Sequence, residues 1–245
     1  MKELNIKVLA INVGGDKGKT TLMANMFGAN LPNAAFIEVE SVNSGAKDLG
    51  VTVVSFKGRQ FKYIYNEIVA SDCAIIDVGA SNCEAFLDGL TKFEDGHDEI
   101  DLFVIPTTPG QKCDIDTIKT VRMLASLGVP AEKIRIIFNR VQESVTDEFP
   151  VILKFSEIDK QCIADANAAV FEAEIFNLLS KRKITVAKAL EDTTDYKAAT
   201  RAARAAGDER AETRALDDLA IQKQAKSTAR HLRRVFEIVT ADIRA

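Results

Sequence analysis

Residues 12–21, NVGGDKGKTT, lie between an apolar run and a helical pattern of apolar side chains. Glycines let successive backbone N–H groups point inward, and the helix that follows adds its positive N-terminal end, so this stretch predicts a cradle for phosphate. Lys19 is expected to reach the β and γ phosphates of a nucleotide, and Thr20 to offer its hydroxyl to Mg²⁺. The alternative is an ordinary glycine-rich turn. The residues expected to contact nucleotide are Gly14, Gly15, Asp16, Lys17, Gly18, Lys19, Thr20 and Thr21.

Acidic side chains stand at the ends of two predicted strands. Asp77 follows the apolar residues 73–76, where a carboxylate is either a ligand of the Mg²⁺ shell or a structural cap. Glu38 and Glu40 flank a single residue and therefore point to the same face. Glu40, nearer the rim, is the better candidate for orienting an attacking water; the alternative is that both are solvated edge charges. Gly79 either brings a backbone N–H to the γ-phosphate or is a simple turn residue.

Short apolar runs alternate with helical patterns through the first part of the chain. Strands are predicted over residues 5–12, 34–40, 51–56, 73–77, 102–106 and 134–138, and helices over residues 18–29, 60–70, 82–93 and 115–127. This alternation predicts an α/β fold, with a mostly parallel, twisted sheet and helices on both of its faces. Because ligands bind beyond the carboxyl ends of such strands, one rim is expected to hold the loop, Glu38 and Glu40, residues 77–79, residues 106–109 and Asn139.

Composition limits the class of protein. The 245 residues are 47% hydrophobic with a net charge of −4, which is enough apolar material for a core and too little positive charge for a polycation that coats nucleic acid. Residues 1–150 carry 15 Lys and Arg against 21 Asp and Glu, and residues 151–245 carry 17 against 15. The four cysteines form no C-x-x-C pair, and no apolar run of about 18 residues exists. A cytoplasmic protein is therefore predicted, with a nucleotide-binding core over residues 1–150 and completing helices with a basic helical tail over residues 151–245.

The order of these motifs resembles the ParA/MinD group of P-loop ATPases and, within it, the StbB-type plasmid stability proteins. The resemblance rests on Ile11-Asn12, Gly18-Lys19-Thr20-Thr21, Val39-Glu40-Ser41, residues 77–82 (DVGASN) and Phe138-Asn139. It implies ATP and Mg²⁺ as cofactors, Lys19, Glu40 and Asp77 as catalytic residues, and Thr20 and Asp77 as metal ligands. It also implies that Asn139, with Arg140 beside it, reads adenine. The implied partners are a second copy of the chain, joined when nucleotide is bound, and a DNA-bound plasmid stability protein.

Two positions of the loop depart from the pattern. Val13 stands where the general motif G-x-x-x-x-G-K-[ST] has its first glycine, and Gly14 stands where ParA-like ATPases carry a signature lysine that reaches the partner's nucleotide across a dimer. Either Lys17 replaces that lysine from another point of the loop, or the contact is absent. The expected function is a Mg²⁺-dependent ATPase switch with slow hydrolysis, acting in plasmid stability or partition. The alternative is a nucleotide-dependent adaptor with little hydrolysis, and a small-molecule kinase or ligase ranks third.

The C-terminal tail has helical patterns with one strong break at Gly207, which predicts a helical hairpin or a hinged helix. Five apolar residues of its last segment recur at helical spacing: Leu232, Val235, Phe236, Val239 and Ile243. Four basic residues accompany them: Lys226, Arg230, Arg233 and Arg234. Such a basic amphipathic helix can pack on the core, contact DNA or a protein partner, or lie on an anionic membrane, as the C-terminus of MinD-like proteins does.

Overall fold

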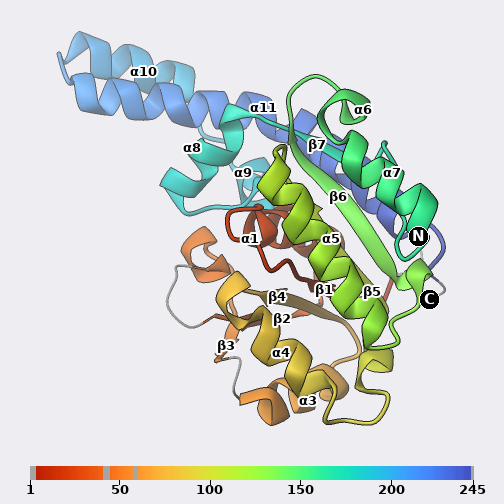
Figure 1. Cartoon of the computed structure of the whole chain (residues 1–245). Coiled ribbons are helices and arrows are strands. Elements are labelled where there is room, and N and C mark those ends of the chain that lie inside the picture. Colours follow the sequence, from red (N-terminus) through yellow and green to blue (C-terminus); the bar gives the residue numbers. More distant parts are fainter. Residues whose placement is uncertain (1–3, 41–44, 58–59, 244–245) are drawn as a thin grey trace.

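Seven parallel strands form one sheet among the described residues, in the order β3-β2-β4-β1-β5-β6-β7 (Figure 1). The computed structural model describes residues 4–40, 45–57 and 60–243. The strands are β1 (Lys7–Ala10), β2 (Ala35–Val39), β3 (Val54–Phe56), β4 (Ala74–Val78), β5 (Leu102–Thr107), β6 (Ile134–Val141) and β7 (Ala169–Phe171). Because β1 lies between β4 and β5, the loop that follows β1 emerges at the centre of the sheet, where ligands of parallel α/β proteins bind.

Helices cover both faces of this sheet, as predicted. One face packs against α3 (Phe61–Ala70), α4 (Cys83–Leu90), α5 (Gln111–Ser126) and α7 (Pro150–Asp159). The other face packs against α8 (Glu174–Arg182), α9 (Val186–Glu191), α11 (Glu209–Val239) and the helix after the loop. Since both faces are covered, β4 and β5 are buried along their whole length, which explains their mostly apolar sequences.

The helix after the loop is continuous but changes its winding. It consists of α1 (Lys19–Leu22), a π-helical turn η1 (Met23–Phe27) and α2 (Gly28–Asn30). All five residues of the π-helical turn are buried, so the helix that supports the loop packs firmly in the core on the face of the sheet that α11 covers. The predicted helix over residues 18–29 is therefore confirmed, and the π turn in its middle is a feature that apolar spacing alone does not reveal.

The seventh strand, β7, is not among the predicted strands. It has three residues and pairs with the end of β6, where the register shifts between Asn139 and Val141. The intervening Arg140 has a φ of 57°, so its backbone is left-handed and does not continue the ladder. The region after residue 150 thus adds a strand to the sheet as well as helices.

The C-terminal tail forms the predicted hairpin. α10 (Tyr196–Ala205) and α11 turn about Gly207, whose φ of 69° favours glycine, and Figure 1 shows the tip of the hairpin projecting from the body of the protein. The far half of α11 packs on the sheet, where Leu232, Val235, Phe236 and Val239 are among its buried residues and the Phe236 ring meets Phe27 edge-on at 5.6 Å. Of the alternatives for this helix, packing on the core is confirmed. No helix of the described chain is long and apolar enough to cross a membrane.

Candidate functional site

The glycine-rich loop is fixed to the ends of the central strands by Asn12. The Asn12 amide nitrogen donates to the Pro106 carbonyl at 2.9 Å, and the Asn12 side-chain oxygen accepts the Gly14 N–H at 2.8 Å. Asp16 and Gly18 adopt left-handed backbone with φ of 56° and 73°, which turns the chain sharply before α1 begins. The loop is therefore shaped by its own backbone and by β5, without any ligand.

Lys19 lies folded over the loop from the first turn of α1. Its side chain is buried, and its Nζ donates to the carbonyl oxygens of Asn12 and Gly14, both at 3.3 Å. Burial lowers the pKa of this amine, and the negative charge of Asp77 opposes the shift. The ammonium group is thus held at the centre of the loop by two long hydrogen bonds, where an anion would be a stronger partner than neutral carbonyls.

Thr20 and Asp77 meet across the site. The Thr20 hydroxyl donates to Asp77 Oδ2 at 2.6 Å, whereas Asp77 Oδ1 is buried and has no hydrogen-bond partner among the described residues. Burial raises the pKa of Asp77 to about 6, against the lowering effects of Thr20 and Lys19. A hydroxyl beside a carboxylate with an unpartnered oxygen is the kind of oxygen donor set that Mg²⁺ prefers, so these residues fit the ion.

Beyond Thr20 and Asp77, the described residues provide few side chains that could bind a metal ion at this site. No cluster of three or more His, Cys, Asp or Glu side chains that could hold a metal exists within the described ranges. This is consistent with Mg²⁺ sites that use one or two protein oxygens and complete their shell with water and phosphate oxygens.

The two glutamates on either side of Val39 have different surroundings, Glu38 within β2 and Glu40 just after it. Glu38 is buried and accepts hydrogen bonds from the Ala46 N–H at 2.7 Å and from the Ser55 hydroxyl at 3.3 Å, so it supports the neighbouring segment. Glu40 is half-buried at the rim, where its Oε1 lies 3.3 Å from the Ser81 hydroxyl and 3.5 Å from the Asn82 amide nitrogen. Ser41, one of the residues that carry the family resemblance, lies outside the described residues.

The N–H of Gly79 already has a partner in this structure. It donates to the Val39 carbonyl at 3.0 Å, which ties the end of β4 to β2. A contact from this N–H to a γ-phosphate would require that hydrogen bond to open. The geometry at Gly79 therefore agrees with the turn interpretation.

The end of β6 is tied to the loop through Asn139 and Arg140. The Asn139 amide nitrogen donates to the Lys17 carbonyl at 2.9 Å, and Arg140 forms an ion pair with Asp16 at 2.8 Å. This hydrogen-bonded guanidinium lowers the pKa of the Asp16 carboxyl. The loop and the strand that was expected to read a base are consequently one connected unit.

A cavity of about 390 Å³ opens beside this unit, between the loop, β6 and α8. Sequence patterns identified four of its lining residues, Gly18, Thr21, Asn139 and Arg140. The others come from the loop helix and from the segment after β6, and they were missed because nothing in a short edge strand and an amphipathic helix marks a ligand site: Leu22, Phe171, Glu172, Ala173, Phe176, Asn177 and Ser180. The cavity has the size of a small-ligand site and combines aromatic with amide side chains.

Gly14, at the position of the signature lysine, has neighbouring side chains where a Cβ atom would lie. A Cβ atom on Gly14 would lie 2.5 Å from the Asp116 carboxylate and 2.8 Å from the Lys17 side chain, so a larger residue there would have to displace these two side chains. Lys17 itself is buried, with its Nζ 2.7 Å from Cys113 Sγ on the first turn of α5. Its amine is thus directed toward α5 within the same chain. Gly15, in contrast, has open space around the position of a Cβ atom.

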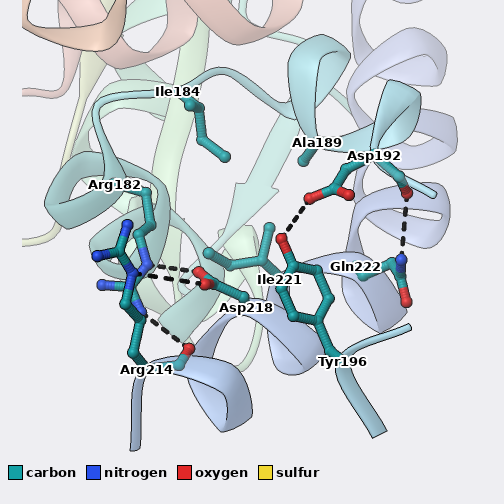
Figure 2. A pocket seen from close by; sticks show the side chains of 9 residues that line it. All are labelled: Arg182, Ile184, Ala189, Asp192, Tyr196, Arg214, Asp218, Ile221 and Gln222. Atoms are coloured by element: carbon teal, nitrogen blue, oxygen red, sulfur yellow. Dashed lines mark hydrogen bonds and ion pairs between the residues drawn. The ribbon is translucent and has the colours of Figure 1, made fainter. Parts of the chain in front are cut away.

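A second pocket, of about 220 Å³, lies at the root of the helical hairpin (Figure 2). Arg182 at the end of α8 pairs there with Asp217 and Asp218 of α11, and its guanidinium also donates to the Arg214 carbonyl. On the opposite wall Tyr196 donates to Asp192 at 2.5 Å, as Figure 2 shows. α8 therefore connects the cavity beside the loop, at its start, with the root of the hairpin, at its end.

Comparisons with known proteins bear on the fold. No protein-family model and no curated protein matches the chain. Among solved structures, the septum site-determining protein MinD of Pyrococcus horikoshii, complexed with Mg-ADP, matches with a TM-score of 0.57 at 14% identity over 96% of both chains. Apo McdA of Cyanothece matches with a TM-score of 0.53 at 14% identity, over 87% of this chain and 99% of that one. The MinD cell division protein of Aquifex aeolicus matches with a TM-score of 0.51 at 12% identity, over 87% and 94%. The chain therefore has the fold of MinD and McdA.

Proposed function

We propose that this protein is a Mg²⁺-dependent ATP switch that hydrolyses ATP slowly and acts in plasmid stability or partition. The observation that carries the proposal is the meeting of Lys19, Thr20 and the partly unpartnered Asp77 carboxylate around a glycine-rich loop at the centre of the sheet. The fold is shared with a MinD that was solved as a Mg-ADP complex, which supports the same ligand class here.

Each residue has a task in this proposal. Lys19 and the loop N–H groups bind the β and γ phosphates, and Thr20 and Asp77 hold the ion, which neutralises charge on the phosphate oxygens when bound. Glu40 orients the attacking water. Asn139 and Arg140, with Phe176 on the facing helix, enclose adenine in the cavity beside the loop.

The nucleotide acts as a switch only if it contacts two states of the protein differently. The γ-phosphate is the part that differs between ATP and ADP, and it would lie where Lys19 now binds two backbone carbonyls. We infer that ATP favours a homodimer across this face, as the family resemblance implies, and that ADP releases it. The resulting change of association state would be read by a DNA-bound plasmid stability protein.

The second candidate is a nucleotide-dependent adaptor with little hydrolysis, favoured by the closed position at Gly14 and by the inward direction of Lys17. Phosphate release separates the two functions. For the ATPase, we expect sustained Mg²⁺-dependent release by the unmodified protein, and a loss of about 100-fold in Glu40→Ala. Phosphate release is measured with and without DNA and the partner protein. If the unmodified protein releases phosphate no faster than Glu40→Ala, the adaptor function is favoured. Glu84→Ala, an exposed glutamate on α4, is the matched control.

The outer face of α11 supports a nucleic-acid contact. The apolar residues Leu232, Val235, Phe236 and Val239 of this helix are buried in the core, so these side chains are not available to enter a lipid layer. No acidic residue lies between Asp218 and Glu237, and the exposed cations follow one side of the helix over about 16 Å: Lys223, Lys226, Arg230, Arg233 and Arg234. We propose that this row lies along the phosphates of DNA bound by the partner protein.

Reversing two of these charges tests the contact. The double variant Arg230→Glu/Arg234→Glu is expected to weaken binding to duplex DNA and to reduce the slope of log K against log salt by about 2, because two phosphate contacts are lost. The control variant Lys62→Glu/Lys92→Glu makes the same change of net charge at exposed positions elsewhere. Equal binding by both variants would contradict the assignment, as would binding of the unmodified protein to anionic vesicles but not to DNA.

A further inference from the structure

Gly79 lacks a side chain at a point where the Glu40 carboxylate comes against the backbone. A Cβ atom built on Gly79 would lie 2.1 Å from Glu40 Oε2 and 2.8 Å from its carboxyl carbon. The backbone of Gly79 has φ −60° and ψ 145°, a conformation that any residue adopts, so backbone strain gives no reason for glycine here. The reason that remains is the close approach of the carboxylate.

The other oxygen of the Glu40 carboxylate, Oε1, is contacted by two residues that follow Gly79. The Ser81 hydroxyl and the Asn82 amide nitrogen both approach Glu40 Oε1, at 3.3 and 3.5 Å, and the Asn82 amide nitrogen also donates to the Ser81 hydroxyl at 3.1 Å. Asn82 is buried, so its amide has little freedom to turn away. These residues belong to the 3-10 turn η4 (Ala80–Asn82), which directly follows Gly79.

The positions of these contacts connect three elements of the site. Glu40 follows β2, whereas Gly79 and η4 follow β4, the strand that contains Asp77. The Gly79 N–H bond to the Val39 carbonyl fixes the two strand ends together next to the carboxylate. A glutamate side chain with three rotatable bonds is thus confined by contacts with the strand that carries the candidate metal ligand.

We propose that Gly79, Ser81 and Asn82 form a seat that positions the Glu40 carboxylate for the attacking water. The proposal rests on the ATPase function proposed above, and the three residues act through Glu40 as positioning residues. In the reaction, the water oxygen forms a bond to the γ-phosphorus while the bond from that phosphorus to the bridging oxygen breaks. The electron pair of the broken bond leaves with ADP, and the water proton passes through Glu40 to the phosphate product. Because the seat acts on the position of the proton acceptor, we expect it to affect the rate of this step and to leave ATP affinity unchanged.

Single-turnover kinetics of Gly79→Ala and Asn82→Ala test the seat. The added methyl group displaces only the end of a flexible side chain, so Gly79→Ala is expected to fold normally and to bind ATP within about 3-fold of the unmodified affinity. Its hydrolysis rate constant is expected to fall by about 100-fold, and that of Asn82→Ala by about 10-fold. In a Glu40→Ala background, neither substitution is expected to lower the rate further, since both act through that carboxylate.

Two further variants sharpen the result. Gly28→Ala adds a methyl group in α2 with its nearest neighbour at 3.5 Å and is expected to leave both affinity and rate unchanged. Ser81→Thr keeps the hydroxyl and is expected to retain several-fold more activity than Ser81→Ala. A Gly79→Ala variant that hydrolyses ATP at the unmodified rate would overturn the proposal, as would a further loss of rate in the Glu40→Ala background.

The seat and the ATPase function can fail separately. If the unmodified protein does not hydrolyse ATP, the proposed function fails, and the crystal structures of the unmodified protein and Gly79→Ala still test the seat. A carboxylate moved away from Ser81 in the variant is the expected result. A Glu40 carboxylate found away from Gly79 in the unmodified protein would contradict the seat whatever the activity.

Discussion

Replacement of Lys19 by alanine is expected to weaken ATP binding by about 100-fold or more and to leave the nucleotide-free protein folded. Hydrogen bonds from an ammonium group to phosphate oxygens contribute about 1.5–3 kcal/mol each, and about 2.7 kcal/mol corresponds to 100-fold in affinity. In the free protein the same amine makes only two 3.3 Å bonds to backbone carbonyls, and its burial disfavours the charge. Its loss therefore affects the complex far more than the free protein.

Calorimetric titration with ATP and Mg²⁺ measures this effect directly, and thermal unfolding without nucleotide reports whether the variant is folded. Light scattering with a non-hydrolysable ATP analogue adds the association state, which we expect to change in the unmodified protein and not in Lys19→Ala. Lys92→Ala, at an exposed lysine just after α4 that forms an ion pair with Asp88 of α4, is the matched control. A Lys19→Ala protein that binds ATP as tightly as its parent would show that the phosphate cradle is assigned wrongly.

Much of the site can be predicted from the sequence because each of its residues lies next to a single strand or helix that the sequence pattern reveals. The loop and its lysine lie between one apolar strand and one helix, and Asp77 directly ends an apolar run, so chain order alone places them at the carboxyl ends of strands. The parallel topology then brings them together. The 2.6 Å hydrogen bond from the Thr20 hydroxyl to Asp77 confirms that these two residues lie together.

Other features depend on contacts between distant parts of the chain. β7 is too short to show any periodicity, and its pairing with β6 defines it. Phe176 enters the cavity from α8, a helix whose pattern is that of any amphipathic helix. In the sequence, Gly79 cannot be distinguished from an ordinary turn glycine. The structure shows that the carboxylate of Glu40, which follows a different strand, lies against it. The closed space at Gly14 likewise depends on Asp116 of α5, about a hundred residues further along the chain.

Asp77→Asn is expected to stabilise the protein in the absence of nucleotide and Mg²⁺. Burial raises the pKa of Asp77 from its ordinary 3.8 to about 6, so the folded state binds a proton more tightly than the unfolded state. The unfolding free energy contributed by this group is therefore highest below about pH 4 and falls as the pH rises to about 6. Above that pH the full cost of ionising a buried carboxyl is present, about 3 kcal/mol for a shift of about two units.

Asparagine has the same shape and keeps an acceptor oxygen for the Thr20 hydroxyl, but it does not ionise. We expect Asp77→Asn to gain about 1–3 kcal/mol of unfolding free energy at pH 8 and nothing at pH 4, measured by urea unfolding in the presence of a chelator. Asp88→Asn, at an exposed carboxylate, is expected to change neither value by more than about 0.5 kcal/mol. Equal stability of Asp77→Asn and its parent at pH 8 would contradict a buried, ionised Asp77.

The same substitution is expected to abolish the rise in unfolding temperature that Mg²⁺ adds to that given by ATP alone. A ligand that binds only the folded state stabilises it in proportion to the logarithm of its concentration over Kd, and the neutral amide offers the ion a much weaker ligand than the carboxylate. Asp77→Asn would therefore be the more stable protein without nucleotide and the less stable one with saturating ATP and Mg²⁺. That reversal separates a functional carboxylate from a structural one, because a structural cap would lose stability in both conditions and a solvated charge would change neither.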